Sequence, residues 1–362
     1  MRAAVLYEAP GTLEIENLSI EKPAANEVLV RIKASGLCHT DLHFMQGHLK
    51  TALPAVLGHE ASGVVEAVGS DVTYVAPGDH VIACLSVFCG ACEHCLSGSP
   101  AICENPDSTN RAQDAPPRIT MDDRPVGQFM RLGAFAEQIL VHQNAVAKVS
   151  RDIPFDRAAL IGCGVTTGLG AVFNTARVEP GATVAVFGCG AIGLNVIQGA
   201  YLAGARRIFA IDVNPDKLSL AGNFGATDLC NASEHDPVAQ ILEATNNKGV
   251  TYSFEAIGHP SAAEQAFMCL SKGGTATIIG LMGAEDKVQL SGLHFLAERK
   301  VQGCDMGSNR FRIDMPKYVQ LYLDGRLNLD DMVSQTIALE DINSGFEAMI
   351  EGQTVRSVIT FD

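Results

Sequence analysis

Four cysteines lie close together in the N-terminal half of the chain, and they are Cys89, Cys92, Cys95 and Cys103. Thiolates at these short spacings can turn inward around one tetrahedral zinc ion without a further ligand, which is how structural zinc sites are built. An iron–sulfur cluster, disulfides or chance are the alternatives. Disulfides fit poorly because no early stretch resembles a secretory signal. Zinc is therefore the ion that we expect this lobe to bind.

A second set of possible metal ligands is spread along the chain. Cys38, His59 and Cys163 together offer two sulfurs and one imidazole nitrogen. Three protein ligands leave a fourth position for water or substrate, and catalytic zinc sites are built in this way. The spacing alone is only suggestive, because single buried cysteines and histidines are more often core residues.

The third chemical motif is a glycine-rich turn after the apolar run 184–187. Gly188, Gly190 and Gly193 form a G-x-G-x-x-G pattern that leads into a predicted helix from Ala191 to about 202. Asp212 ends the next apolar run, about twenty residues later. This order is typical of a dinucleotide-binding unit, and the acid favours NAD over NADP. An ordinary strand–helix turn is the less favoured alternative.

The length and net charge of the chain limit the class of protein in which these motifs occur. The 362 residues are enough for two domains. Lys and Arg number 26 and Asp and Glu number 41, which gives a net charge of −15 and argues against nucleic acid or an anionic membrane surface as partners. The sequence shows no evident apolar run near the ~20 residues of a membrane helix, so we expect a cytoplasmic protein.

Short apolar segments separated by turn signals dominate the N-terminal part. They cover residues 3–7, 27–34, 61–68 and 80–83, and the turns include Ala76-Pro77-Gly78-Asp79. This pattern predicts an antiparallel, β-rich domain in front of the dinucleotide-binding unit.

With these motifs in hand, the chain resembles the zinc-dependent alcohol dehydrogenases of the medium-chain dehydrogenase/reductase superfamily. The Gly58-His59-Glu60-Ala61 segment, the four-cysteine lobe, Leu160 to Gly164 and the glycine turn occur in the family's order and spacing over the whole chain. The resemblance implies an α/β protein. A GroES-like β-rich catalytic domain would cover 1–164 and 306–362 with a zinc lobe at about 89–103, and a Rossmann domain with a doubly wound parallel sheet would cover 165–305.

The resemblance also implies roles for the residues of the active site. Two zinc ions per chain are expected: Cys38, His59 and Cys163 would hold the catalytic zinc, and the lobe would hold the structural one. Asp41 would orient the ligating imidazole, and Glu60 would lie beside the zinc. Thr40 and His43 would relay the alcohol's proton to solvent. Read without the family, His43 is an exposed loop histidine, and Thr40 or Asp41 is a helix cap.

Coenzyme and substrate contacts follow from the same resemblance. Thr167 and Ile192 would pack on the nicotinamide, Lys217 and Arg356 would hold ribose and pyrophosphate, and His39 stands where many relatives carry arginine. The expected pocket walls are Leu49, Leu85, Phe129, Met130 and Leu281. A polar insertion over 105–124 would cover the mouth of the cleft. Within it, Asp107 would repel an anionic substrate, for which Arg111 or Arg118 could compensate.

The implied activity is reversible, NAD-dependent and zinc-dependent oxidation of primary medium-chain or aromatic alcohols, by hydride transfer from a zinc-bound alkoxide. The substrate would be a small molecule and the enzyme a homodimer or homotetramer. One alternative is a formaldehyde dehydrogenase that acts on a thiol adduct such as S-hydroxymethylglutathione. A zinc-free quinone or enone reductase is a second, and a non-catalytic dinucleotide-binding protein is a third.

Overall fold

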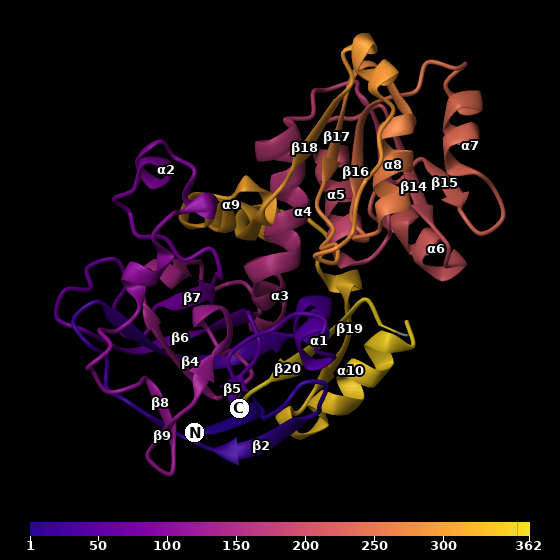
Figure 1. Cartoon of the computed structure of the whole chain (residues 1–362). Helices are drawn as coiled ribbons and strands as arrows, with labels where there is room; N and C mark the ends of the chain where they lie inside the picture. Colours follow the sequence, from indigo (N-terminus) through magenta and orange to yellow (C-terminus); the bar gives the residue numbers. More distant parts are fainter. Residues whose placement is uncertain (353) are drawn as a thin grey trace. The chain divides into compact units, whose positions relative to one another are not determined.

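The computed structural model describes residues 1–352 and 354–362. The chain forms two compact units (Figure 1): the first comprises Met1–Cys163 and Arg310–Asp362, and the second comprises Gly164–Asn309. The boundaries differ from the expected 164 and 306 by one residue at the first crossing and by four at the second.

A seven-stranded sheet forms the centre of the first unit. Its strand order is β12-β7-β6-β4-β20-β19, and β11 also pairs with β4. The strands are β4 (Glu27–Gly36), β6 (Glu60–Val68), β7 (His80–Ala83), β11 (Gln138–His142), β12 (Val146–Lys148), β19 (Val333–Ile337) and β20 (Arg356–Thr360). All pairings are antiparallel except that of β19 with β20.

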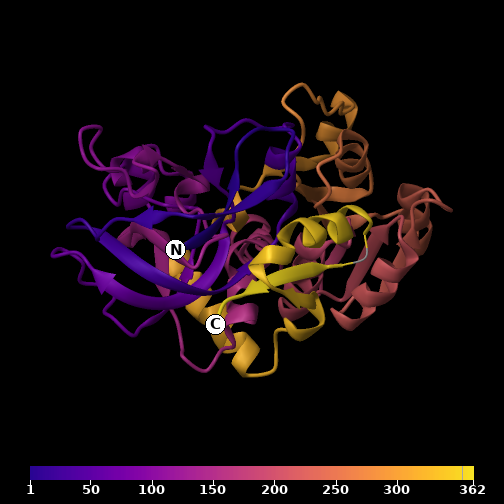
Figure 2. The same cartoon turned by 90° about the horizontal axis from the view of Figure 1, so that it is seen from below.

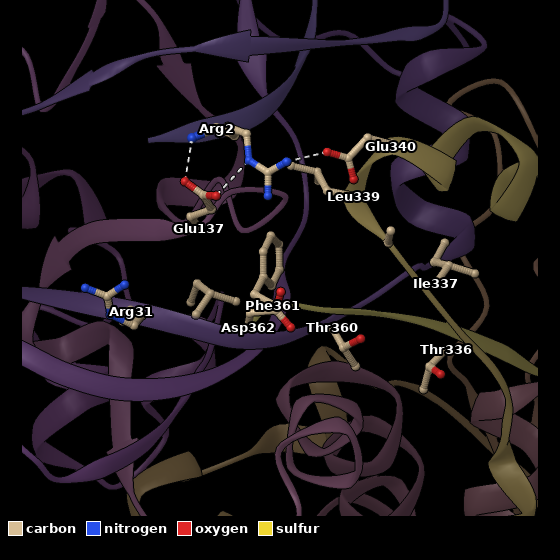
Figure 3. Close-up of a pocket in the computed structure, with 12 residues that line it drawn as sticks. Arg2, Arg31, Glu137, Thr336, Ile337, Leu339, Glu340, Thr360, Phe361 and Asp362 are labelled. Carbon is tan, nitrogen blue, oxygen red and sulfur yellow. Dashed lines mark hydrogen bonds and ion pairs between the residues drawn. The ribbon is translucent and has the colours of Figure 1, made fainter.

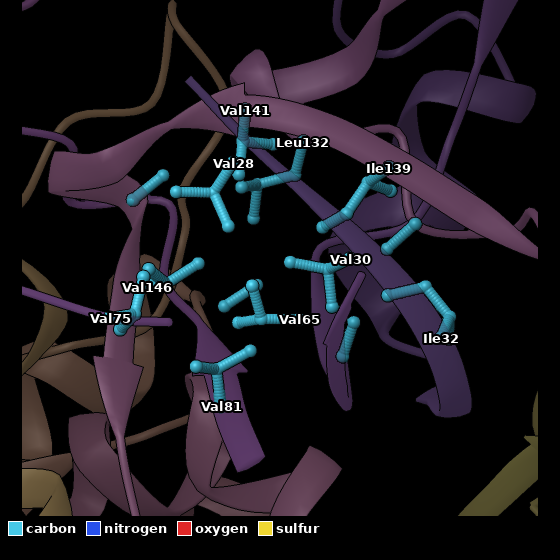
Figure 4. Close-up of a cluster of buried hydrophobic side chains, with 14 of the residues drawn as sticks. Val28, Val30, Ile32, Val65, Val75, Val81, Leu132, Ile139, Val141 and Val146 are labelled. Carbon is cyan, nitrogen blue, oxygen red and sulfur yellow. The ribbon is translucent and has the colours of Figure 1, made fainter. Parts of the chain in front are cut away.

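Alternation along β4 explains why this strand is central. Val28, Val30 and Ile32 are buried, whereas Arg31 between them is exposed, which is the period of a strand with one face in the core. The buried side chains pack against Val65 of β6 and the neighbouring strands (Figure 4). Packing on this core fixes the position of β4. It therefore also fixes the position of the residues that directly follow its end at Gly36.

Smaller sheets and helices complete the first unit. One sheet has the order β10-β5-β1-β2 and another the order β3-β8-β9. Their strands are β1 (Arg2–Leu6), β2 (Leu13–Asn17), β3 (Ser19–Ile20), β5 (Ala55–Val56), β8 (Ile119–Met121), β9 (Arg124–Pro125) and β10 (Gly127–Gln128). The helices are α1 (His39–Met45), α2 (Glu93–Leu96), α3 (Phe155–Leu160), α9 (Phe311–Leu323) and α10 (Ile342–Ile350).

The two ends of the described chain lie near one another within the first unit, as both views show (Figures 1 and 2). Arg2 and Asp362 line the same polar pocket of about 620 Å³ (Figure 3). Arg2 donates to Glu137 at 2.8 Å and also contacts Glu340, so two carboxylates neutralise it. Arg31, which also lines this pocket, pairs with Glu66.

The second unit contains a six-stranded parallel sheet with the order β15-β14-β13-β16-β17-β18. The strands are β13 (Thr183–Phe187), β14 (Arg207–Asp212), β15 (Asp228–Asn231), β16 (Val250–Glu255), β17 (Leu270–Ile278) and β18 (Lys300–Gly303). The helices are α4 (Thr166–Gly170), α5 (Ala191–Leu202), α6 (Pro215–Asn223), α7 (Pro237–Ala244) and α8 (Pro260–Met268). The strand order reverses direction at β13, which is where such sheets bind ligands.

Both faces of this sheet are covered. Ala185 and Phe187 of β13 share a buried cluster with Phe267 of α8, whereas Val186, between them, lies under Gly193 of α5. A strand buried on both faces reads as a continuous apolar run, which is why 184–187 shows no alternation. The predicted doubly wound parallel sheet is therefore confirmed.

One apolar stretch was not anticipated from the sequence. Phe155–Ala176 is helical throughout and is, among the described residues, the one helix long and apolar enough to cross a membrane. The expectation that no such run exists is therefore wrong. However, 83% of its most apolar window is buried inside the protein, which is the behaviour of a core helix. Its glycines, among them Gly162 and Gly168, conceal the apolar character of the run.

Candidate active site

The end of β4 and the start of α1 position the first two residues of the site. Cys38 is the N-cap of α1 and is 5% exposed, and Asp41 in the first turn is fully buried. Thr40 Oγ1 lies 3.7 Å from Cys38 Sγ, so the hydroxyl expected to accept the alcohol's proton is next to an expected zinc ligand. His39 begins the helix and is exposed.

Asp41 fixes the orientation of His59. Its Oδ1 accepts hydrogen bonds from His59 Nδ1 at 3.1 Å and from the Gly58 amide at 3.0 Å. Gly58 has φ +91°, and a Cβ there would lie 2.6 Å from the Phe135 backbone nitrogen. Glycine is therefore required for the turn that brings the imidazole to Asp41. Because Nδ1 bonds the carboxylate, Nε2 is the nitrogen left to bind a metal.

Glu60 pairs with an arginine from the far end of the chain. Arg356 Nη2 lies 3.0 Å from Glu60 Oε1 and 3.8 Å from Cys38 Sγ, and Nη1 donates to the Leu37 carbonyl at 3.1 Å. Both side chains of the ion pair are buried. The observed partners of Arg356 thus belong to the buried cluster, and its expected contact with coenzyme stays a prediction.

Cys163 reaches the cluster on a π-helical turn, Ile161–Val165. Such turns are frequent at functional sites because they re-aim a side chain within a helix. A Cβ at Gly162 would lie 2.9 Å from the Ala83 carbonyl oxygen and 3.4 Å from Glu60 Cα, so glycine allows this turn to approach β6 and β7. The structure therefore brings together three ligands that are widely separated in the sequence.

The buried cluster fits a metal ion. One ligand atom from each of Cys38, His59, Glu60 and Cys163 lies within 4.8 Å of the others, and all four residues are buried. His59 Nε2 and Glu60 Oε2 have no hydrogen-bond partner among the described residues. Unpaired buried polar atoms are costly, and a cation would satisfy both. Two thiols and one imidazole nitrogen form the donor set that zinc prefers.

Charge within the cluster is strongly coupled. A hydrogen bond from the Cys163 thiol lowers the pKa of Cys38 well below its usual range, and the same bond raises the pKa of Cys163. Burial raises the pKa of Glu60 to about 7, against the opposing effect of Arg356. Burial alone would lower the pKa of His59, but the charges of Asp41 and Cys38 raise it well above its usual range. The cluster thus pairs negative charge on Cys38 with positive charge on His59 and Arg356.

The predicted lobe forms a second, local cluster. The ligand atoms of Cys89, Cys92, Cys95 and Cys103 also lie within 4.8 Å of one another. Sγ–Sγ distances are 3.9 Å for Cys89–Cys95 and for Cys92–Cys103. Cys92 is the N-cap of the short helix α2, and the Ala91 and Cys92 amides donate to Cys89 Sγ at 3.4 and 3.3 Å. Backbone amides thus support negative charge on these sulfurs.

The pKa values within the lobe differ from one sulfur to the next. Hydrogen bonds from the Cys95 and Glu104 amides lower the pKa of Cys92 to about 6, and the Ala91 and Cys92 amides lower that of Cys89. Burial raises the pKa of Cys95 to about 12. Four converging sulfurs without a carboxylate or imidazole fit a closed structural zinc site.

Among the expected pocket walls, Phe129 lies beside the buried cluster. Its ring centroid is 6.0 Å from that of His59 and 4.6 Å from that of Phe44, and both contacts are edge-on. Met130 follows in a left-handed conformation (φ 50°) and packs against the apolar core cluster that contains Phe129. Leu49 is half-buried just after α1, and Leu85 packs against the core in Figure 4.

The 105–124 segment is anchored through Glu27, which is buried at the start of β4. Arg111 Nη2 and Arg118 Nε lie 2.6 and 2.7 Å from its carboxylate oxygens. The expectation that either arginine compensates for Asp107 is wrong, because Glu27 already engages both guanidinium groups. Asp107 instead pairs with Arg131 at 2.5 Å. Arg131, the cation of this pair, directly follows Phe129 and Met130 in the sequence, so Asp107 lies beside that segment.

In the second unit, the three glycines have different environments. Gly188 has φ +96°, which the turn requires, and a Cβ at Gly193 would lie 1.7 Å from the Gly188 carbonyl oxygen. Gly190, the N-cap of α5, has nothing within 4 Å of such a Cβ, so its face is open to a ligand. These are the turn, close-packing and ligand-approach roles of a dinucleotide-binding loop.

Asp212 at the end of β14 closes this loop. Its Oδ2 accepts a hydrogen bond from the Cys189 amide at 2.7 Å, and its Oδ1 accepts one from Asn214 at 2.9 Å. Lys217 on α6 is half-buried, and its charge acts on Cys189. The Asp212 carboxylate thus lies at the glycine turn and Lys217 lies near it, and their contacts with coenzyme stay predictions.

The remaining predicted residues of the second unit lie on different elements. Thr167 on α4 is buried and its Oγ1 lies 3.3 Å from Met306 Sδ, and Ile192 is half-buried at the start of α5. Gly168 lets α4 approach α5, because a Cβ there would lie 2.7 Å from the Ile192 carbonyl oxygen. Leu281, beyond β17, is 51% exposed.

Sequence reasoning missed several residues that shape the site. Gly36 is one: a Cβ there would lie 2.5 Å from Glu60 Oε2. Phe44 is another, and His48, whose ring approaches that of His43, is a third. The spacing of Phe44 and His48 from Cys38 gives no signal by itself, because their roles depend on how α1 ends.

Two family models match the chain. An alcohol dehydrogenase GroES-like domain matches residues 24–151, and a zinc-binding dehydrogenase domain matches residues 191–324. The chain is 37% identical to alcohol dehydrogenase 2 of Zea mays, covering 100% of this chain and 97% of the relative. It is 41% identical to S-(hydroxymethyl)glutathione dehydrogenase of Paracoccus denitrificans, covering 99% of each chain.

Among solved structures, benzyl alcohol dehydrogenase from Acinetobacter calcoaceticus superposes with a TM-score of 0.94 at 32% identity. The match covers 100% of this chain and 99% of that one.

Proposed function

The chain belongs to the zinc-dependent alcohol dehydrogenases, and from this membership we propose that it oxidises primary medium-chain or aromatic alcohols reversibly to aldehydes, with NAD as hydride acceptor. The observation that carries the proposal is the buried cluster of Cys38, His59 and Cys163 with the unpaired His59 Nε2. A site of this composition polarises an oxygen without being saturated by protein ligands.

Cys38, His59 and Cys163 would hold a zinc ion, which would supply Lewis acidity and lower the pKa of a bound hydroxyl. The chain's own residues do the rest. Asp41 keeps the His59 ring in one orientation through its bond to Nδ1. Thr40 is 3.7 Å from Cys38 Sγ and accepts the proton of the alcohol, and His43 is the next group in the relay. Phe129 excludes water beside His59.

The coenzyme preference follows from Asp212. A carboxylate there accepts hydrogen bonds from ribose hydroxyls and repels a 2′-phosphate. Asp212→Gly should therefore raise kcat/KM with NADP relative to NAD. Asp228→Asn, at the start of the neighbouring strand β15, is a control that removes an acid from the same sheet. An unchanged preference in Asp212→Gly would contradict the NAD assignment.

Two observations bear on the substrate. The edge-on pair of Phe44 and Phe129 beside His59 suits an alkyl or aryl group. The relative from Paracoccus denitrificans, named for S-(hydroxymethyl)glutathione, supports a thiol adduct as the second candidate. Asp107 disfavours an anionic adduct, but its partner Arg131 offsets that charge.

A substrate panel separates these candidates. We expect kcat/KM with NAD to rise from ethanol to longer-chain and benzyl alcohols, and formaldehyde to be a poor substrate with or without glutathione. Turnover of formaldehyde only when glutathione is present would favour the second candidate. Metal analysis completes the test, because two zinc ions per chain support catalysis and one zinc confined to the lobe supports a non-catalytic protein.

A further inference from the structure

The C-terminal end of α1 turns the chain back onto the helix. Gly47 has φ +75°, the His48 amide donates to the His43 carbonyl at 3.0 Å, and the Gly47 amide donates to the Phe44 carbonyl at 3.1 Å. This pair of bonds is a Schellman motif, in which a glycine in the left-handed conformation reverses the chain after a helix. The motif fixes the backbone of His48 directly against that of His43.

The two imidazole rings meet as a result. His43 Nδ1 and His48 Nδ1 are 3.4 Å apart, and the ring centroids are 5.7 Å apart. His43 is half-buried and His48 is exposed. His48 therefore offers His43 a route to bulk water that passes through a second titratable ring.

We propose that His48 carries the proton of alcohol oxidation from His43 to water, and so acts on the reaction through His43. This inference rests on the proposed function. His43 receives one proton at Nε2 and becomes positively charged, its Nδ1–H then passes to His48 Nδ1, and His48 releases its Nε2 proton to water. One proton enters and one leaves. Each ring recovers its starting tautomer by exchange with water.

The charges around His43 agree with this direction of transfer. The charged and titratable groups that act on the ring are His48 and the Cys38 thiolate. Burial lowers the pKa of His43, the charge of His48 lowers it further, and Cys38 opposes both effects. A lowered pKa keeps His43 neutral, and so able to accept a proton, at lower pH. Removal of His48 should therefore move the acidic limb of alcohol oxidation to higher pH.

The test is His48→Gln in the full-length enzyme loaded with zinc, because glutamine keeps polar atoms near His43 but cannot carry a proton. We expect kcat for alcohol oxidation near pH 6 to fall roughly three- to tenfold, with KM and the rate at high pH little changed. A higher concentration of a proton-accepting buffer should restore the rate of the variant. Gln46→Ala, an exposed neighbour at the helix end, is the matched control and should leave the pH profile unchanged.

The outcomes distinguish failure of the proposed function from failure of the His48 relay. If the unmodified enzyme oxidises no alcohol, the proposed function fails. If it is active and His43→Gln alters the pH profile whereas His48→Gln does not, the present inference fails alone. NMR titration of the His43 ring gives a second measurement that does not need turnover. Its pKa should rise in His48→Gln, and an unchanged titration would overturn the proposal.

Discussion

The two sulfur clusters of the first unit use similar ligands but are assembled differently. The lobe takes its four cysteines from positions 89–103, and backbone amides support its sulfurs. The buried cluster draws Cys38, His59 and Cys163 from distant segments, and Asp41 bonds to His59 whereas Arg356 lies against Cys38. The four sulfurs of the lobe are enough for all four positions of a tetrahedral site. In the buried cluster, His59 Nε2 and Glu60 Oε2 remain unpaired among the described residues. Local assembly suits a closed structural site, and assembly from distant segments suits an open reactive one.

The substitution expected to have the largest effect is Cys163→Ser, which tests whether the buried cluster is the reactive site. We expect kcat/KM to fall on the order of a thousandfold, because loss of one ligand removes several kcal/mol of Lewis-acid stabilisation. The zinc content should fall from two ions to one, with little change in Tm. Cys269→Ser is the control, since Cys269 is a buried thiol whose bond to the Ala266 carbonyl a serine can replace. Full activity in Cys163→Ser would refute the catalytic role of the buried cluster.

Cys103→Ser should have the opposite signature. We expect a loss of roughly 3 to 5 kcal/mol of stability, because a structural zinc contributes directly to folding. Thermal unfolding checks this, and the protein that remains folded should keep most of its kcat. Cys304→Ser is the control at a similarly half-buried cysteine. A variant with unchanged Tm and zinc content would show that the lobe holds no zinc.

A smaller effect is expected from Asp41→Asn. The amide keeps an acceptor for the Gly58 amide but removes the charge beside His59. Loss of such an outer partner typically costs 10- to 100-fold in metal affinity or activity. Zinc competition with a chelator measures the first and kcat/KM the second. Asp314→Asn, another buried aspartate in the first unit, should change neither, and equal effects of both variants would reduce Asp41 to a structural role.

The smallest effect concerns His39, which is exposed at the start of α1. His39→Arg should tighten NADH a few-fold and slow its release, since a permanent, bidentate cation holds phosphate better than a partly charged imidazole. Fluorescence titration and stopped-flow release measure this. Gln46→Arg adds the same charge at the other end of the helix and serves as control. Unchanged NADH affinity in His39→Arg would remove His39 from the coenzyme site.

Structural features that depend only on neighbouring residues could be predicted from the sequence. The dinucleotide helix and the His80–Ala83 strand occur as predicted, and the lobe converges as its spacing requires. The central sheet was identified through short apolar segments, but the pairing of β20 with β4 and β19 depends on tertiary contacts. For the same reason, the pairing of Arg356 with Glu60 and that of Glu27 with Arg111 and Arg118 could not be predicted. Buried ion pairs between distant residues leave no periodic signal.

The family resemblance supplied what spacing alone could not. Cys38 and Cys163 are separated by most of the first unit, so their residue types only suggested joint ligation, and the match to a known pattern made it a definite expectation. His48 lay outside that pattern, because its place beside His43 depends on the turn at Gly47. The approach of two side chains across a helix end thus required coordinates.

The return of β20 to the central sheet has a consequence for biosynthesis. Translation proceeds from the N-terminus, so the fourth sulfur of the lobe is made 60 residues before Cys163, as 163 minus 103 shows. The four sulfurs of the lobe are therefore complete while the ribosome has still to produce Cys163 of the buried cluster. Arg356 is made after all the sulfurs and the imidazole of both clusters, so the buried cluster gains this charge compensation later than its possible ligands.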